Sequence, residues 1–112
     1  MTPETPDTPA EVNITTFIAL NKEGLTVVDV REEYEFAAGH VPHAQHIPLD
    51  ELSSRLDQIG GPDPVYLICA SGNRSLKAAR IIAAAGRDAV SVVGGTKAWV
   101  DSEQPTERAG NS

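Results

Sequence analysis

Short apolar segments alternate with helical patterns along this chain. Three apolar segments, rich in β-branched or aromatic residues and bounded by glycine, proline or charged residues, cover residues 25–30, 65–69 and 89–93. They are too short for helices, and their apolar positions barely alternate with polar ones, which is typical of strands buried on both faces. Residues 12–14 and 44–47 are two shorter candidate strands.

Helices are expected between these strands. Leu52, Leu56 and Ile59 recur at helical spacing and are followed by a Gly-Gly-Pro sequence that ends the pattern. The full set of expected helices runs from Thr15 or Thr16 to 21 and over residues 32–38, 49–59, 75–85 and 96–100. Strands that alternate with helices require crossover connections, so the sequence predicts an α/β fold with a mostly parallel sheet. Ligands bind such sheets beyond the carboxyl ends of the strands.

Composition places both ends of the chain outside the predicted folded unit. Residues 1–10 of the 112 hold three prolines and no large aliphatic residue after Met1, and residues 102–112 are similarly polar. Segments of this kind bury little apolar surface. We therefore expect one domain over residues 11–101, between an acidic flexible tail at 1–10 and a second flexible tail at 102–112.

Charge and cysteine content narrow the partners and the compartment. Lys and Arg number 9 against 16 Asp and Glu, which gives a net charge of −7 and argues against nucleic acid or anionic membranes as partners. Cys69 is the only cysteine and cannot form an internal disulfide. Because the N-terminus lacks a basic start and an apolar run, it does not resemble a secretory signal, and we expect a cytoplasmic protein.

The chemically informative segment is Cys-Ala-Ser-Gly-Asn-Arg-Ser at residues 69–75, which joins a buried strand to a helix. Gly72 permits a positive φ and Asn73 tolerates one, so the loop can direct several backbone N–H groups at one point. Arg74 adds a permanent positive charge. A helix N-terminus contributes roughly 0.3–1 kcal/mol, whereas one pKa unit requires about 1.36 kcal/mol, so several N–H groups must act together to favour the thiolate of Cys69.

A cysteine that ends an apolar strand is more often a small buried hydrophobe than a nucleophile. The glycine, asparagine and arginine between Cys69 and Ser75 favour a reactive cysteine instead, because a helix beginning at Ser75 needs none of them.

The pattern Cys-x-x-Gly-x-Arg-Ser, with Cys69 first, resembles the active loop of rhodanese-type sulfurtransferases. Other segments match signatures of this family in order and spacing: Asp-Val-Arg-Glu at 29–32, Glu-Phe at 35–36, Gly-His-Val-Pro at 39–42, Ala44, Ile-Pro at 47–48, Gly-Gly at 94–95 and Trp99. The resemblance implies a three-layer rhodanese-like α/β domain with a central, mostly parallel five-stranded sheet flanked by helices.

The resemblance also implies a sulfur-transfer reaction that needs no metal or organic cofactor. Cys69 would be the catalytic nucleophile, taking a sulfane sulfur from thiosulfate, a small donor anion, or from another persulfide donor. The Cys69 persulfide would then pass its sulfur to cyanide or to a thiol, including a protein thiol. The substrate-binding residues would be Ala70, Ser71, Gly72, Asn73, Arg74 and Ser75.

Loop length and loop charge refine this expectation. Four residues separate Cys69 from Arg74, whereas cysteine-dependent phosphatases, including those with the rhodanese fold, have five, so we expect negligible phosphatase activity. Ala70 and Ser71 are uncharged where strong thiosulfate users often carry a cation. With the negative net charge, this predicts that thiosulfate is a poor donor and that a persulfide is the physiological one. His43 replaces a common glycine and is interpreted as a tolerated variation.

Other polar residues have structural explanations. Arg31 and Glu35 lie four residues apart and are expected to form a surface pair, while Asp29 is expected to brace a loop near the site. Trp99 is expected to pack in the core or over the site. The histidines at every third position from 40 to 46 are interrupted by proline and lack further ligands, so no metal site is expected.

The sequence leaves two alternatives to an enzyme. One is a non-catalytic rhodanese-like binding or regulatory module, and the other is a redox sensor in which Cys69 is oxidised to sulfenic acid or glutathionylated. The presence of Cys69 with Gly72 and Arg74 favours the sulfurtransferase, because a binding module does not need a nucleophile. The redox sensor is less favoured because the sequence has no second cysteine to act as a resolving partner.

Overall fold

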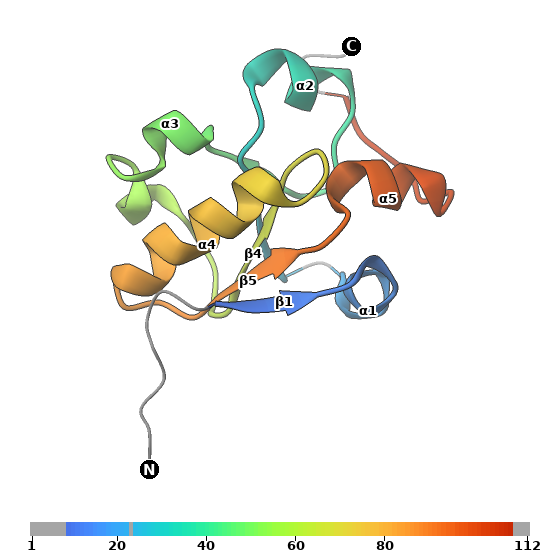
Figure 1. The fold of residues 1–112 in the computed structure, drawn as a ribbon. Helices are drawn as coiled ribbons and strands as arrows, with labels where there is room; N and C mark the ends of the chain where they lie inside the picture. The colour runs from blue at the N-terminus through green and yellow to red at the C-terminus, as the bar shows by residue number, and fades with distance from the viewer. Residues whose placement is uncertain (1–8, 23, 109–112) are drawn as a thin grey trace.

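The computed structural model describes residues 9–22 and 24–108 and contains a five-stranded parallel sheet flanked by helices (Figure 1). The strand order is β1-β5-β4-β2-β3, with every neighbouring pair parallel. The strands are β1 (Ala10–Val12), β2 (Thr26–Asp29), β3 (Gln45–His46), β4 (Val65–Ile68) and β5 (Ala89–Val92). The expected α/β architecture is therefore confirmed, and β4, which leads to Cys69, lies in the middle of the sheet.

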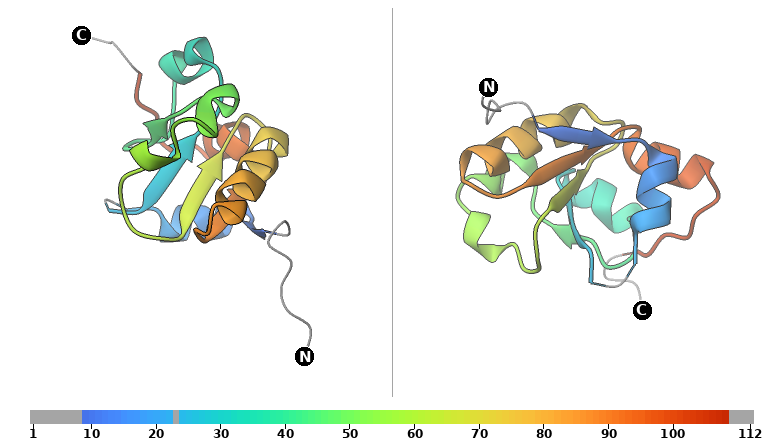
Figure 2. Two further views of the ribbon diagram at one scale, coloured as in Figure 1. Left: turned by 90° about the vertical axis from the view of Figure 1, so that its left-hand side faces the viewer. Right: turned by 90° about the horizontal axis from the view of Figure 1, so that it is seen from below.

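Helices cover both faces of the sheet (Figures 1 and 2). Their bounds are α1 (Ile14–Leu20), α2 (Glu33–Ala38), α3 (Leu49–Leu52), α4 (Asn73–Ala84) and α5 (Gly95–Asp101), with a 3₁₀ turn η1 (Leu56–Gln58). α3 and α4 pack together on one face, and α1 and α5 pack together on the other. α2 lies beyond the carboxyl ends of the strands, near the loop that follows β4 (Figure 1).

The two hydrophobic cores explain why the strands are continuously apolar. Successive side chains of a strand point to opposite faces of the sheet. Leu67 on β4 therefore packs into the core beneath α4, while Tyr66 and Ile68 pack into the core that holds Phe17 and Trp99. Both faces of β4 are buried, as the unbroken apolar pattern of this segment predicts.

Several element boundaries differ from the predicted ones because polar side chains set them. The strand expected at 12–14 lies at Ala10–Val12, since Asn13 caps α1 by accepting a hydrogen bond from the Thr16 N–H at 2.8 Å. The helix expected over 49–59 is instead α3 followed by η1, with Ser54 donating its hydroxyl to the Glu51 carbonyl where α3 ends. The apolar residues at helical spacing in this segment therefore lie on a short helix and a 3₁₀ turn rather than on one long helix.

The segment after α5 folds back over the domain. The Trp99 indole donates to the Pro105 carbonyl at 2.7 Å, and His40 and Glu107 exchange two backbone hydrogen bonds of 2.9 Å each. Residues 102–108 of the tail expected over 102–112 thus contact the domain, although most of them are exposed, and the flexibility of this tail stays a prediction. Residues 1–8 and 109–112 of the two expected tails lie outside the described residues.

None of the helices in the described part of the chain is long and apolar enough to cross a membrane.

Candidate functional site

Cys69 lies at the carboxyl end of β4, where the central strand leads into α4. Its side chain presents only 1% of its surface to solvent, as a buried structural cysteine also would. The surrounding backbone distinguishes a reactive cysteine from a structural one, because the Gly72 N–H donates to the Cys69 Sγ at 3.0 Å. Gly72 has a φ of 120°, so the loop turns inward here, as the sequence predicted for this glycine. The N–H groups therefore face the sulfur instead of turning away from it.

The loop favours the thiolate form of Cys69 despite its burial. Burial raises the pKa of Cys69 and is the largest single influence on it. The Ser75 hydroxyl and the backbone N–H groups of Ser75, Gly72 and Ser71 act in the opposite direction, and together they hold the pKa below its usual value. Hydrogen bonds thus shift this buried thiol toward its anionic form. A thiolate of this kind is a nucleophile.

α4 begins at Asn73 instead of at the predicted Ser75, so Asn73 and Arg74 belong to the first turn of the helix. Asn73 does not have the positive φ that the sequence analysis allowed for it. Ser75 fixes this junction, because its hydroxyl donates to the Gly72 carbonyl at 3.0 Å and lies 2.8 Å from the Ser91 hydroxyl of β5. The loop that surrounds the sulfur is therefore anchored to the neighbouring strand.

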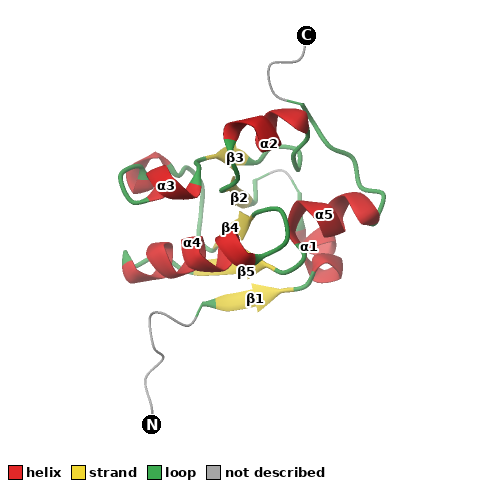
Figure 3. Ribbon diagram, turned by 45° about the horizontal axis from the view of Figure 1, so that its top comes forward, coloured by secondary structure: helices red, strands yellow, loops and turns green. Residues whose placement is uncertain are grey.

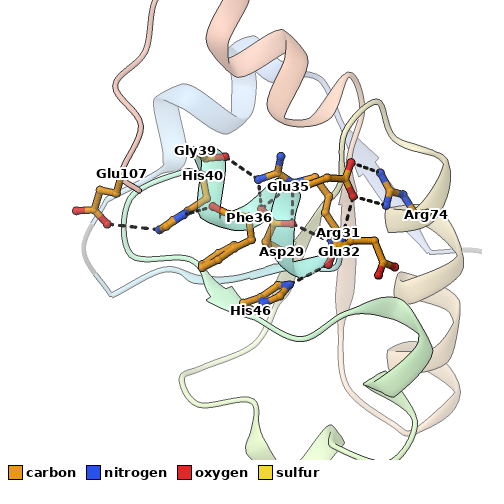
Figure 4. A network of polar contacts seen from close by, with 10 residues as sticks. All are labelled: Asp29, Arg31, Glu32, Glu35, Phe36, Gly39, His40, His46, Arg74 and Glu107. Carbon is orange, nitrogen blue, oxygen red and sulfur yellow. Dashed lines mark hydrogen bonds and ion pairs between the residues drawn. The ribbon is translucent and has the colours of Figure 1, made fainter. Parts of the chain in front are cut away.

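Arg74 forms a two-fold ion pair with Glu35 of α2, with N–O distances of 2.8 and 3.0 Å (Figure 4). The Arg74 guanidinium lowers the pKa of Glu35 to about 2, and the carboxylate raises the pKa of Arg74 in return. The predicted surface pair between Arg31 and Glu35 is therefore wrong, because Glu35 reaches Arg74 across 39 residues of sequence. Arg74 still supports a negative charge on Cys69, but its charge is largely matched by Glu35.

Arg31 instead pairs with Asp29 in the interior next to the site. Its guanidinium contacts both carboxylate oxygens of Asp29 at 2.8–3.1 Å and donates to the Gly39 carbonyl at 2.8 Å. Asp29 is fully buried, and it also accepts the backbone N–H of Arg31. The carboxylate thus braces the loop between β2 and α2, as the sequence predicted.

Two of the three histidines support this same region. The Phe36 ring is stacked between His40 and His46, with centroid separations of 3.7 and 4.4 Å (Figure 4). A ring nitrogen of His46 lies 2.8 Å from the Arg31 carbonyl, and one of His40 lies 2.8 Å from the Phe36 carbonyl. Within residues 9–22 and 24–108, no cluster of His, Cys, Asp or Glu is arranged to hold a metal ion.

The N-terminus of α5 contacts the Cys69 loop directly, which the sequence analysis missed. The Thr96 N–H donates to the Cys69 carbonyl at 2.8 Å, and the Lys97 N–H donates to the Ala70 carbonyl at 3.0 Å. Gly95 has a φ of 59°, and any Cβ atom there would overlap the Cys69 and Ala70 carbonyl groups. The Gly-Gly pair at 94–95 was the available sequence signal, since close approach of two backbones requires a residue without a side chain.

Comparison with known proteins agrees with this geometry. The profile of the rhodanese-like domain matches residues 16–102. YrkF of Bacillus subtilis, a proposed sulfur carrier protein, is 40% identical over 78 residues, which are 69% of this chain and 42% of YrkF. GlpE of Pseudomonas fluorescens, a thiosulfate sulfurtransferase, is 33% identical over 95 residues, which are 84% of this chain and 87% of GlpE. The chain thus spans less than half of one relative and most of the other.

A solved structure shows the same fold. The rhodanese-related protein from Thermoplasma volcanium superposes with a TM-score of 0.80 and 30% sequence identity, over 88% of this chain and 97% of that protein. The profile match covers most of the sequence, and the parallel five-stranded sheet and the loop after its central strand lie inside the matched region. The chain therefore belongs to the family of rhodanese-like domains.

Proposed function

We propose that this protein is a sulfurtransferase in which Cys69 carries a sulfane sulfur from a donor to a thiophilic acceptor. The donor is thiosulfate or another persulfide, and the acceptor is cyanide or a thiol. The observation that carries the proposal is the Gly72 N–H at 3.0 Å from the Cys69 Sγ, within a loop that lowers the pKa of this cysteine. The sulfurtransferase name of the relative GlpE supports the same reaction class.

The first half-reaction loads the cysteine. The Cys69 thiolate attacks the outer sulfur of thiosulfate, a new S–S bond forms, and the S–S bond of thiosulfate breaks, so that sulfite leaves with the electron pair of that bond. The product is a Cys69 persulfide anion. In the second half-reaction cyanide attacks the outer sulfur, thiocyanate leaves, and the thiolate returns. Both steps need an anion to be stabilised at the same place, which is what a ring of N–H groups supplies.

The loop residues have separable roles in this proposal. Ser71, Gly72 and Ser75 direct N–H groups at the sulfur, and the Ser75 hydroxyl, whose one proton goes either to the sulfur or to the Gly72 carbonyl, also lowers the pKa of Cys69. Ala70 connects the loop to α5 through its carbonyl. Asn73 and Arg74 begin α4, so they act on the site through the helix and through the Glu35 ion pair, and we assign them no direct hydrogen bond to the sulfur.

The charge balance favours a persulfide over thiosulfate as donor. Arg74 is the cation closest to the loop in sequence, but Glu35 holds it in a two-fold ion pair. A dianion approaching the site therefore meets a neutralised pair on a protein whose net charge is −7. We expect thiosulfate to be used slowly and a persulfide to be used faster.

A non-catalytic binding module is the second candidate function. The loop argues against it, because a binding surface gains nothing from N–H groups that stabilise an anion on a cysteine 1% exposed. A redox sensor is less favoured for a different reason. Oxidation to a sulfenic acid is relayed by a second cysteine in many sensors, and this sequence has only one cysteine.

The test is the intact mass of the protein after incubation with thiosulfate and, separately, with inorganic polysulfide. We expect the mass of one sulfur atom to be gained and then lost on addition of cyanide, with thiocyanate formed in equal amount. Cys69→Ala is the matched control, because it removes the sole cysteine and must gain nothing. A wild-type protein that takes up no sulfur from either donor would leave the binding module as the better description.

A further inference from the structure

A groove of about 540 Å³ lies beside the Cys69 loop, between α2 and α5. Figure 3 places these two helices next to the loop that joins β4 to α4. Ala70, which follows the cysteine, and Thr96, whose N–H holds the Cys69 carbonyl, both line the groove. A molecule in the groove therefore lies against Ala70, the residue next to the cysteine, and against the helix N-terminus that holds the Cys69 carbonyl.

The walls of the groove are partly apolar and unusually exposed. Tyr34 of α2 is 76% exposed and Val100 of α5 is 50% exposed, and Ala38 adds a further apolar surface. Large apolar side chains left in water next to a hollow are typical of ligand sites. The volume suits a small organic molecule, since pockets for such ligands measure about 300–1,000 Å³.

The charged residues that line the groove are paired with one another or with neighbours. Arg31 is bound by Asp29, and Lys97 lies 3.0 Å from Asp101. Glu35, the remaining charged residue of the lining, is bound by Arg74. The lining thus holds two cations and two carboxylates, so the groove has no net positive charge to attract a small dianion.

Thr96 supplies a polar group without a partner. The residue is only 6% exposed and its hydroxyl oxygen is buried. Among the described residues, nothing forms a hydrogen bond with this oxygen. Buried hydroxyl groups are normally satisfied. Because this oxygen is closed off from solvent, a ligand in the groove reaches it only after the Thr96 side chain rotates, so the case for the groove rests on its apolar walls and its balanced charge.

We propose that this groove binds the organic body of a small thiol, in its free or its persulfide form, whose body is largely apolar and carries no net negative charge. The proposal rests on the proposed function, because the groove serves the same sulfur. In the persulfide donor R–S–SH, R is the organic body that lies in the groove. The Cys69 thiolate attacks the outer sulfur of this donor, a Cys69 persulfide forms as the S–S bond of the donor breaks, and R–S⁻ leaves with the electron pair of that bond. In reverse, R–S⁻ attacks the outer sulfur of the Cys69 persulfide and receives it.

The test compares acceptors on protein loaded with sulfur from inorganic polysulfide. Benzyl mercaptan is the apolar thiol, 2-mercaptoethanesulfonate is the anionic thiol, and cyanide is the acceptor too small to need the groove. We expect benzyl mercaptan to react faster than the sulfonate. Tyr34→Ala and Val100→Ser should each slow the benzyl mercaptan reaction by about tenfold, the usual scale for losing a good apolar contact, and should leave the cyanide rate unchanged.

Leu20→Ser is the matched control, since Leu20 is 40% exposed at the end of α1 and does not line the groove. An independent readout is the binding of benzyl methyl sulfide, which cannot react, followed by NMR shifts in Cys69→Ala with and without Tyr34→Ala. If loaded protein transfers sulfur equally to both thiols, or Tyr34→Ala changes neither rate nor shifts, the groove proposal is wrong and the sulfurtransferase stands. If wild type takes up no sulfur, the proposed function fails and the substrate role of the groove fails with it.

Discussion

Replacing Gly95 with alanine tests whether the N-terminus of α5 holds the Cys69 loop in its working shape. Gly95 has a φ of 59°, and an added Cβ atom would overlap the carbonyl groups of Cys69 and Ala70. The two backbones would have to separate, which would weaken the hydrogen bonds from Thr96 and Lys97 to that loop. The change therefore perturbs the site from outside the cysteine itself.

The magnitude follows from two parts. A positive φ costs an alanine about 1–2 kcal/mol, and losing two loop hydrogen bonds costs about 0.5–1.5 kcal/mol each. Gly95→Ala should thus lower the free energy of unfolding by about 2–5 kcal/mol, a large fraction of the usual 5–15 kcal/mol. The Cys69 pKa should also rise, because the loop N–H groups no longer converge on the sulfur.

Gly86→Ala is the matched control, since Gly86 has a φ of 96° and a Cβ atom there meets nothing within 4 Å. It should lose only the about 1–2 kcal/mol of backbone strain and keep the thiol titration of wild type. Urea unfolding measures the stability, and thiolate absorbance across a pH series measures the pKa. If Gly95→Ala loses no more stability than Gly86→Ala and titrates like wild type, α5 does not position the loop.

Three further substitutions probe single contacts. Ser75→Ala removes a hydroxyl that lowers the Cys69 pKa, so the thiolate fraction at pH 7 should fall about tenfold by ultraviolet absorbance; an unchanged titration would exclude this role. Glu35→Gln should cost about 1.5–3 kcal/mol of stability at neutral pH. Arg74 lowers the pKa of Glu35 from 4.5 to about 2, so the stabilisation by this ion pair is complete above pH 4.5 and is lost as the pH falls through 2. The urea midpoints of the variant and the wild type should therefore converge in acid. A gap between the two midpoints that stays constant with pH would contradict the ion pair. Thr96→Val removes the unpartnered hydroxyl and should raise the stability of the ligand-free protein by about 1 kcal/mol in thermal unfolding, and a loss of stability would mean that the hydroxyl has a partner.

The sequence predicted the architecture because the signals for it are local. Apolar segments buried on both faces indicate parallel strands, and the alternation with helices indicates crossovers. The position of Cys69 and the inward turn at Gly72 follow from the strand, the loop and the glycine, all of which are adjacent in sequence.

The partners of charged side chains could not be predicted in the same way. Glu35 was expected to pair with Arg31 at helical spacing, but α2 points it at Arg74 on another helix, and Arg31 turns inward to Asp29. Such pairs depend on how helices are placed on the sheet, and spacing along the chain carries no information about that. The contact of Gly95 with the Cys69 loop also depends on how a helix is placed on the sheet, so the sequence did not predict it. The Gly-Gly pair at 94–95 was the one local sign of this contact.

The burial of Cys69 offers a way to distinguish the protein with a free Cys69 from the protein with a Cys69 persulfide. A sulfur 1% exposed offers bulky labelling reagents almost no room. The second sulfur of a persulfide extends beyond the first by the length of a bond of about 2.05 Å. A bulky maleimide dye should therefore label the protein with a Cys69 persulfide and leave the protein with a free Cys69 unlabelled. The dye absorbance would then give the fraction of protein that carries sulfur in a mixture.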